Sequence, residues 1–269
     1  MKVAAFDFDG TLHVGPHLGP DMSHLEASHG GFRAADLEAI EAWRAAGHLA
    51  VAATGRSRAA LAHGMQGSTL RFDYQVLSNG ASAATGDGAE LIFAYPIDPD
   101  VLRAAIDAFS EQPGMAVFGT TIGAIDGVFA NNTGDTSNLT AHFTPMTKAD
   151  VPDHTFAVVP LWVPEDDTLR ADVVVWAEAL GGVTVAQNQT YVDVMAPGRT
   201  KGTGVLELLD HLGLDRADVE LYTFGDSWND LSMHAIADHA HSFTHSPADV
   251  QAATGTVLTS VAEVLTSYL

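Results

Sequence analysis

Cysteine is absent from the 269 residues, so neither a disulfide framework nor a thiolate metal site is possible. Long hydrophobic runs are also missing: no stretch approaches the ~18 consecutive apolar residues that a membrane-spanning helix needs. The N-terminal sequence MKVAAFDFDG has an apolar run too short for a signal peptide, and charge interrupts it. These absences predict a cytoplasmic protein that has no membrane partner.

Positive charge is scarce. Lysine and arginine together number 12 against 34 aspartates and glutamates, which leaves a formal net charge of −22. Such a surface repels nucleic acids and anionic membranes, so neither is an expected partner. Apolar residues make up 46% of the chain, too large a share for a disordered protein. We therefore expect one large domain, or a domain that carries an insertion, with a sizeable core.

Strand-like and helical patterns alternate along the chain, which predicts an α/β fold with a mostly parallel sheet. KVAAF, HLAVAATG and YQVLSNG are typical of buried strands, and RAADLEAIEAWRAAG has helical spacing. The texture changes at about residue 81, where strands and helices separated by Asn-, Thr- and Gly-rich loops predict a smaller α+β unit. We expect residues 1–80 and 188–269 to form the core and residues 81–187 to form an inserted domain.

Four polar clusters follow predicted core strands or begin the helices after them, at the edge where open parallel sheets bind ligands. Taken singly, each has an ordinary reading as a turn, a helix N-cap or a solvated lysine. An ordinary turn explains Asp7 and Asp9 less well, because carboxylates two residues apart on a strand share a face and repel each other. The clusters are Asp7 with Asp9, Thr54 with Gly55, Lys201, and Asp226 with Asn229 and Asp230.

The set DFDGTL, ATGRS, KG and GDSWND, in this order and spacing, resembles the four motifs of the haloacid dehalogenase (HAD) superfamily. The insertion between the second and third motifs resembles the Cof-type branch, subfamily IIB, which carries an α/β cap there. The resemblance covers the core and implies a Rossmann-like parallel-sheet core with an inserted α+β cap. It also implies a Mg²⁺-dependent phosphatase for small phosphorylated metabolites, such as sugar phosphates.

In this family the first aspartate attacks phosphorus, so the resemblance assigns an aspartyl-phosphate to Asp7. Asp9 becomes the general acid for the leaving oxygen and then the base for water, and its carboxylate is expected to point away from the metal and to hold a proton more freely. Mg²⁺ would be held by Asp7, the backbone carbonyl of Asp9, and Asp226. The implied phosphate-binding groups are the Phe8 amide, Thr54, Gly55, Lys201 and Asn229, with Asp230 supporting the metal site or Lys201, and Arg56 and Arg199 as candidate leaving-group contacts.

Two other functions stay open at this stage. A phosphomutase of the phosphomannomutase type shares this cap and the same aspartates, but would have to bind a bisphosphate. Permanent cations are sparse in residues 81–187, where only Arg103, Lys148 and Arg170 occur, and this argues against a bisphosphate. A non-catalytic binding or regulatory protein on the same fold is the second alternative. Nothing in the sequence indicates an oligomeric state.

Some segments depart from the family pattern. His13, His17, His24 and His29 lie in a long Gly- and Pro-containing stretch, where loop packing near the cap is favoured over a metal site. HSFTHSPADV replaces the usual Gly-Asn-Ala after the fourth motif, at a strand end expected to lie away from the chemistry. Cap aromatics such as Trp162 and Trp176 are expected to belong to the core of the cap.

Overall fold

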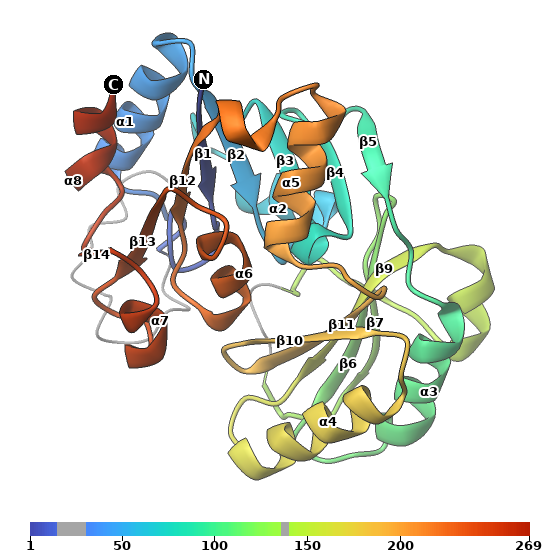
Figure 1. The fold of residues 1–269 in the computed structure, drawn as a ribbon. Coiled ribbons are helices and arrows are strands. Elements are labelled where there is room, and N and C mark those ends of the chain that lie inside the picture. The colour runs from blue at the N-terminus through green and yellow to red at the C-terminus, as the bar shows by residue number, and fades with distance from the viewer. Residues whose placement is uncertain (15–30, 136–139) are drawn as a thin grey trace.

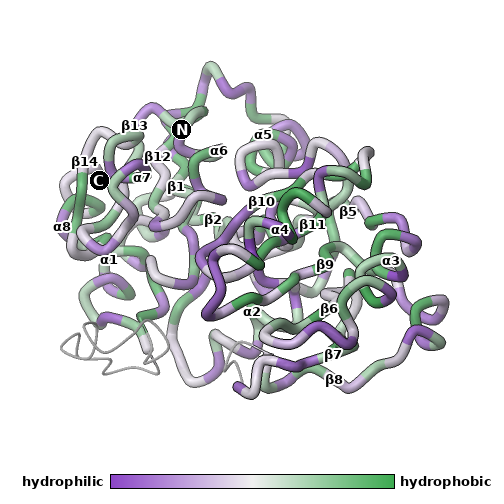
Figure 2. The backbone as a smooth tube through the Cα atoms, turned by 90° about the horizontal axis from the view of Figure 1, so that it is seen from below, coloured by the Kyte–Doolittle hydropathy of each residue, from purple (hydrophilic) through white to green (hydrophobic). Residues whose placement is uncertain are grey.

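The computed structural model describes residues 1–14, 31–135 and 140–269; His17, His24 and His29 lie outside the described residues. The described chain forms two units, each built on its own sheet (Figure 1). Both units contain stretches of hydrophobic residues (Figure 2), and a separate buried apolar cluster fills each. The expected α/β fold with a parallel-sheet core and an inserted α+β cap is confirmed.

The core sheet has the strand order β14-β13-β12-β1-β2-β3-β4-β5. The strands from β14 to β3 pair in parallel, whereas β4 and β5 are added as an antiparallel extension. The chain leaves β1 toward β2 on one side and later returns to β12 on the other, so β1 lies at the switch point of the sheet. Its strands are β1 (Lys2–Phe6), β2 (Leu49–Ala53), β3 (Tyr74–Leu77), β4 (Ser82–Thr85), β5 (Leu91–Ala94), β12 (Glu220–Phe224), β13 (His239–Phe243) and β14 (Thr256–Leu258).

The cap sheet has the order β10-β11-β9-β6-β7-β8 and is antiparallel except for the short β7–β8 pair. Helices α3 and α4 cover its face away from the core (Figure 1). The cap strands are β6 (Ala116–Thr121), β7 (Gly127–Asn131), β8 (Thr144–Pro145), β9 (Phe156–Trp162), β10 (Thr184–Asn188) and β11 (Tyr191–Met195).

Helices cover both faces of the core sheet, because successive strand residues point to opposite sides. On β1, Ala4 and Phe6 pack in one cluster with α1 and α8, while Val3 and Ala5 pack with α5 and α6 on the other face. The α-helices are α1 (Ala34–Ala45), α2 (Arg58–Gly64), α3 (Pro99–Phe109), α4 (Asp167–Ala179), α5 (Lys201–His211), α6 (Leu231–His234), α7 (Ala248–Ala252) and α8 (Ala262–Leu265). Short 3₁₀ turns are η3 (Ser78–Gly80), η4 (Lys148–Asp153), η5 (Arg216–Asp218), η6 (Trp228–Asp230) and η7 (Thr266–Tyr268).

Sheet membership places the two units differently from the ranges expected from the sequence. β4 and β5, which lie beyond residue 80, extend the core sheet, and β11, which lies beyond residue 187, pairs within the cap sheet. An apolar strand pattern does not specify which sheet a strand joins. The change in sequence pattern therefore did not mark either of the two places where the chain passes between the core sheet and the cap sheet. We propose that the cap runs from about residue 95 to residue 196.

None of the helices in the described ranges combines the length and apolarity that crossing a membrane requires.

Direct bonds link the cap to the core. The hydroxyl of Ser57, the N-cap residue of α2, donates to Asp126 Oδ2 of the cap at 2.5 Å. The His63 ring of α2 also stacks on the His142 ring of the cap, with ring centroids 4.5 Å apart. These contacts hold the cap over the carboxyl edge of the core sheet.

Candidate active site

The loop after β1 turns sharply at the switch point. The Asp7 amide continues the pairing of β1 with β12 by donating to the Phe224 carbonyl at 2.8 Å. Gly10 then adopts a φ of +85°, and a Cβ atom on it would lie 2.5 Å from Asp226 Oδ2. Only glycine fits both this conformation and this approach. The DGT turn therefore brings the first and fourth motifs into contact.

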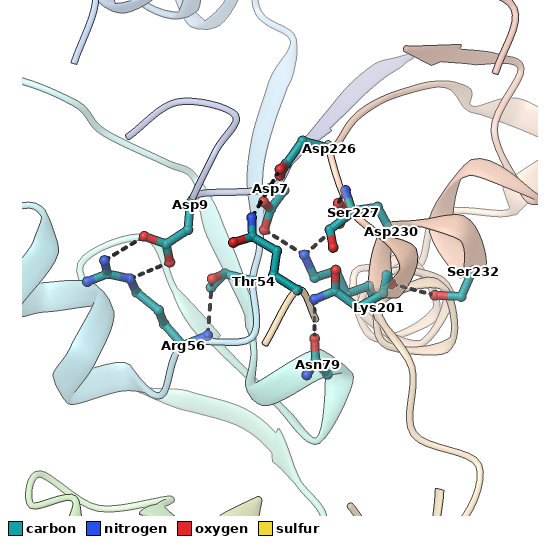
Figure 3. A network of polar contacts seen from close by, with 12 residues as sticks. Asp7, Asp9, Thr54, Arg56, Asn79, Lys201, Asp226, Ser227, Asp230 and Ser232 are labelled. Carbon is teal, nitrogen blue, oxygen red and sulfur yellow. Dashed lines mark hydrogen bonds and ion pairs between the residues drawn. The ribbon is translucent and has the colours of Figure 1, made fainter. Parts of the chain in front are cut away.

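A buried acidic group forms where these motifs meet (Figure 3). One carboxylate oxygen from each of Asp7, Asp226 and Asp230 lies within 4.8 Å of the others. Lys201, at the first turn of α5, places its Nζ 2.5 Å from Asp7 Oδ1 and 2.6 Å from Asp230 Oδ1. One ammonium thus faces three carboxylates, so the group carries excess negative charge.

The protonation equilibria of this group follow from burial. Burial raises the pKa of Asp7 to about 7, against the lowering effect of Lys201. The pKa of Asp226 is raised well above its usual value by burial and by the neighbouring Asp7 and Asp230. The pKa of Lys201 is raised by Asp230 and Asp7 in spite of its burial, so this lysine stays charged.

Asp9 has a different environment, although it is only two residues from Asp7. Its carboxylate accepts bonds from Arg56 Nε at 2.7 Å and Nη2 at 2.6 Å, outside the acidic group (Figure 3). Arg56 itself lies over the Phe8 ring, with Cζ 4.8 Å from the ring centroid. Arg56 holds the pKa of Asp9 well below its usual range in spite of burial. The carboxylate does point away from the acidic group, but the expectation that it holds a proton more freely is wrong for this arrangement, because the guanidinium keeps it ionised.

The second motif lies beside this pair. The Thr54 amide, just after β2, donates to the Val76 carbonyl at 3.0 Å, and the Thr54 hydroxyl accepts from the Arg56 amide at 3.1 Å. Thr54 and Gly55 both line the cavity that reaches Asp7 and Asp9. The Phe8 side chain is buried in the core.

A polar chain connects the fourth motif to the cap. Asn229 Nδ2 donates to Asn79 Oδ1 at 3.0 Å, and Asn79 Nδ2 donates to Asp193 Oδ2 of β11 at 2.7 Å. Burial raises the pKa of Asp193 to about 7. Our sequence reasoning missed both Asn79 and Asp193. The Ser-Asn-Gly turn was the available signal, since Asn79 has a φ of +52°, a conformation that asparagine tolerates better than most residues.

Two expectations about the edge of the site are wrong. Arg199 does not line the cavity: its Nη1 lies 2.5 Å from Glu207 Oε2, and its guanidinium lies over the Tyr95 ring, where the chain passes between core and cap. His245, from the segment expected to lie away from the chemistry, bonds through Nε2 to the Gly10 carbonyl at 2.9 Å. The same atom lies 3.8 Å from Asp226 Oδ2.

An open cleft between core and cap is lined by Asp7, Asp9 and the second motif, and it holds about 610 Å³ of space, part of which is open to solvent. The lining that the cap supplies mixes hydroxyl and amide side chains with two aromatic rings and a proline, and Asp193 is its one acidic residue. No Lys or Arg of the described cap residues contributes to it. Trp162 and Trp176 pack in the cap, as expected, whereas Phe143 and Tyr191 line the cavity. The cap residues in the lining are Thr120, Thr140, Phe143, Pro160, Asn188, Tyr191 and Asp193.

The cations of the cap point elsewhere. Arg103 pairs with Asp100, Lys148 pairs with Asp107, and Arg170 pairs with Asp167. The positive charge available to an anionic ligand therefore comes from the core, from Lys201 and Arg56.

A family model for haloacid dehalogenase-like hydrolases matches residues 4–264. The chain belongs to this family. The resemblance drawn from the four motifs is thereby confirmed, and with it the expectation of a hydrolase.

Individual relatives are more distant. A Streptococcus pyogenes protein named as a bifunctional phosphatase/peptidyl-prolyl cis-trans isomerase is 29% identical over 241 residues, which are 88% of this chain. The chain spans 46% of that protein's length. Among solved structures, a HAD subclass IIB sugar phosphatase has a TM-score of 0.78 at 22% identity, with 100% of this chain and 99% of that chain covered. A HAD-like hydrolase from B. subtilis has a TM-score of 0.81 at 16% identity, with both chains fully covered. At these identities the two structures show that the fold is shared, cap included.

Proposed function

We propose that the chain is a Mg²⁺-dependent phosphatase that hydrolyses small phosphate monoesters through an aspartyl-phosphate on Asp7. One observation carries the proposal: two aspartates on one loop lie in opposite electrostatic environments. Asp7 belongs to the acidic group beside Lys201, whereas Asp9 pairs with Arg56 at the cavity wall. A nucleophile and an acid/base catalyst need separate environments, and bound Mg²⁺ and phosphate would have to reverse the present order, in which the pKa of Asp7 is raised and that of Asp9 is lowered.

The chemistry has two displacements. A carboxylate oxygen of Asp7 first bonds to phosphorus, the ester P–O bond breaks, and Asp9 delivers a proton to the leaving oxygen. Water then attacks the phosphorus, Asp9 accepts its proton, and the bond between phosphorus and Asp7 breaks to release inorganic phosphate. We infer that a phosphate oxygen replaces Asp9 as the partner of Arg56, because both side chains line the same cavity. The pKa of Asp9 then returns toward its usual range, so that Asp9 can carry the proton.

The acidic group fits a hard dication. Asp226 Oδ1 is buried and accepts no hydrogen bond from the described residues, and oxygen ligands are what Mg²⁺ prefers. We assign Asp7, Asp226 and the backbone carbonyl of Asp9 to hold it, with Asp230 in support through Lys201. When bound, Mg²⁺ would offset the excess negative charge and polarise the phosphoryl group.

The remaining groups would bind the phosphoryl oxygens. Lys201 would supply the charge, the Thr54 hydroxyl and the Gly55 amide would donate hydrogen bonds from residues that line the cavity, and Asn229 would contribute from η6. By resemblance to the family, the backbone amide of Phe8 would also bind a phosphoryl oxygen. Negative charge that spreads over these oxygens in the transition state is stabilised by donors fixed in advance.

The substrate we propose is a monoester whose remainder is small, neutral and hydroxylated, as in a sugar phosphate. The cap offers hydroxyl and amide groups, one carboxylate and two aromatic rings to the cavity. It offers no cation there among the described residues, and a phosphomutase would need one for its second phosphate. Hydrolysis is therefore favoured over transfer.

The test is phosphate release from hexose monophosphates, hexose bisphosphates, nucleotides and pyridoxal 5′-phosphate, in Mg²⁺ and in EDTA. We expect Mg²⁺-dependent release, strongest with a hexose monophosphate and lost in Asp7→Asn. Wild-type activity in Asp7→Asn would refute the mechanism. Transfer to a sugar without release of phosphate would replace the phosphatase with a mutase.

A further inference from the structure

The hairpin β10–β11 carries the cap into the catalytic centre. Its two-residue turn, Gln189 and Thr190, is fixed from behind, because the Val163 amide donates to the Thr190 carbonyl at 2.9 Å and Trp162 Nε1 donates to the Thr190 hydroxyl at 3.1 Å. From this turn Gln189 Nε2 reaches to 3.5 Å from Asp226 Oδ2. A side chain of the cap thus meets a carboxylate of the acidic group directly.

The backbone at this turn does not suit glutamine. Gln189 has a φ of +51°, in the left-handed region that glycine enters freely and that a longer side chain enters at a cost. Only two other non-glycine residues among those described have positive φ, Ser78 and Asn79, and Asn79 belongs to the polar chain at the same site. Strained residues that gather at one site point to function there.

We propose that Gln189 is a positioning residue that the cap contributes to the active site. When the cap is closed, the carboxamide of Gln189 bonds to Asp226 Oδ2 and fixes the carboxylate, while Oδ1 stays available to a cation. The donor is neutral, so it orients Asp226 without reducing the negative charge that binds the cation. A glycine at position 189 would relieve the backbone strain, but it would have no side chain to reach Asp226.

This proposal rests on the proposed function, and it predicts a particular combination of effects. Gln189→Gly relieves the strain and removes the side chain. Gln189→Asn keeps an amide and tolerates the turn, but it is one methylene shorter. Gln187→Ala, on the same hairpin, is the matched control: among the described residues, the Gln187 side chain bonds to the backbone carbonyl of Gln189, at 3.3 Å, and does not reach Asp226.

Three quantities are measured: kcat and KM on the best ester, Mg²⁺ affinity by calorimetry on metal-free protein, and Tm in EDTA. We expect both Gln189 variants to lose kcat at least fivefold with KM within twofold. Mg²⁺ affinity should fall two- to fivefold, and Tm in EDTA should equal or exceed that of wild type. Gln187→Ala should match wild type in all three.

Two results overturn the proposal: wild-type kcat and Mg²⁺ affinity in both Gln189 variants, or a lowered Tm that accounts for their lost activity. Failure of the proposed function is separate, since wild type itself would then release no phosphate. In that case the Mg²⁺ titration alone tests the positioning role. Reduced Mg²⁺ affinity in the Gln189 variants with an unchanged Tm would support the role, and unchanged Mg²⁺ affinity would refute it.

Discussion

Replacing Asp7, the proposed nucleophile, should stabilise the metal-free protein. Asp7 has a pKa of about 7 in the folded state, raised from the 3.8 of an ordinary aspartate chiefly because it is buried. This rise in pKa corresponds to about 4 kcal/mol, which the ionised group costs the folded state above pH 7. Asparagine has nearly the same volume and no charge. It must still find hydrogen bonds in a buried site, so we expect Asp7→Asn to gain about 2 kcal/mol.

The pH dependence has a definite sign. Between pH 4 and pH 7 the folded protein binds more protons at Asp7 than the unfolded chain does, so the stability of the wild type falls as pH rises through this range. Asp7→Asn lacks this loss. Its advantage should therefore be greatest at pH 8 and should shrink as the pH falls toward and below 4, because Asp7 is then protonated in the folded state and increasingly so in the unfolded chain.

The assay is urea unfolding in EDTA at pH 8 and at pH 5, repeated with Mg²⁺. Asp172→Asn is the control, because it removes the same charge from an exposed position of α4 and should change stability by less than about 0.5 kcal/mol. Mg²⁺ should stabilise wild type more than Asp7→Asn, since the variant has lost one charged ligand. A less stable Asp7→Asn at pH 8 in EDTA would refute the claim that the acidic group carries uncompensated charge.

Three further predictions follow from single contacts. Arg56→Met leaves the Asp9 carboxylate without its bidentate partner, so it should cost about 3 kcal/mol in urea unfolding. The pKa of Asp9 in the free enzyme should rise, so the pH profile of kcat/KM should move to higher pH, and an unchanged kcat/KM profile would contradict the pairing. Burial lowers the pKa of His241 from 6.5 to about 4, so the folded protein holds this ring neutral. Up to about 3 kcal/mol of unfolding free energy is present above pH 6.5 and should be lost as the pH falls through 4. His241→Gln should flatten this pH dependence in a series of unfolding curves. Ser57→Ala removes the bond to Asp126 and the cap of α2, so we expect a loss of about 1–2 kcal/mol and a raised KM, whereas an unchanged KM would show that this bond does not hold the cap.

The parts of the site that the sequence predicted are local. Each motif follows a buried strand or begins a helix, and parallel strands place their carboxyl ends at one edge, so Asp7, Lys201 and Asp226 could be expected together before any contact was known. Even so, the motifs supplied no partner for Asp9. Its pairing with Arg56 depends on a side-chain conformation two residues after Thr54, which no spacing specifies.

The parts that the sequence did not predict depend on how the cap docks. Asp193 is an ordinary polar residue of a strand until β11 joins the cap sheet and faces Asn79. Gln189 becomes part of the site only because the hairpin extends over η6 and reaches Asp226. Arg199 was expected near the substrate from its place beside the third motif, but the passage between core and cap turns it toward Tyr95. Sequence patterns within the core or within the cap do not predict the contacts between the two units.

The distribution of charge ties these observations to substrate choice. In a chain of net charge −22, a phosphate can be held only where the local field is reversed, and the core does this at Lys201, Arg56 and the proposed Mg²⁺ site. The described cap residues bring Asp193 to the cavity, whereas the cap's Lys and Arg side chains pair with other aspartates and do not line it. One phosphoryl group can therefore be neutralised at the core, whereas a second negative group under the cap would meet a carboxylate. If the proposed function holds, the same arrangement would favour a monoester over a bisphosphate, and the cap would select by charge as well as by shape.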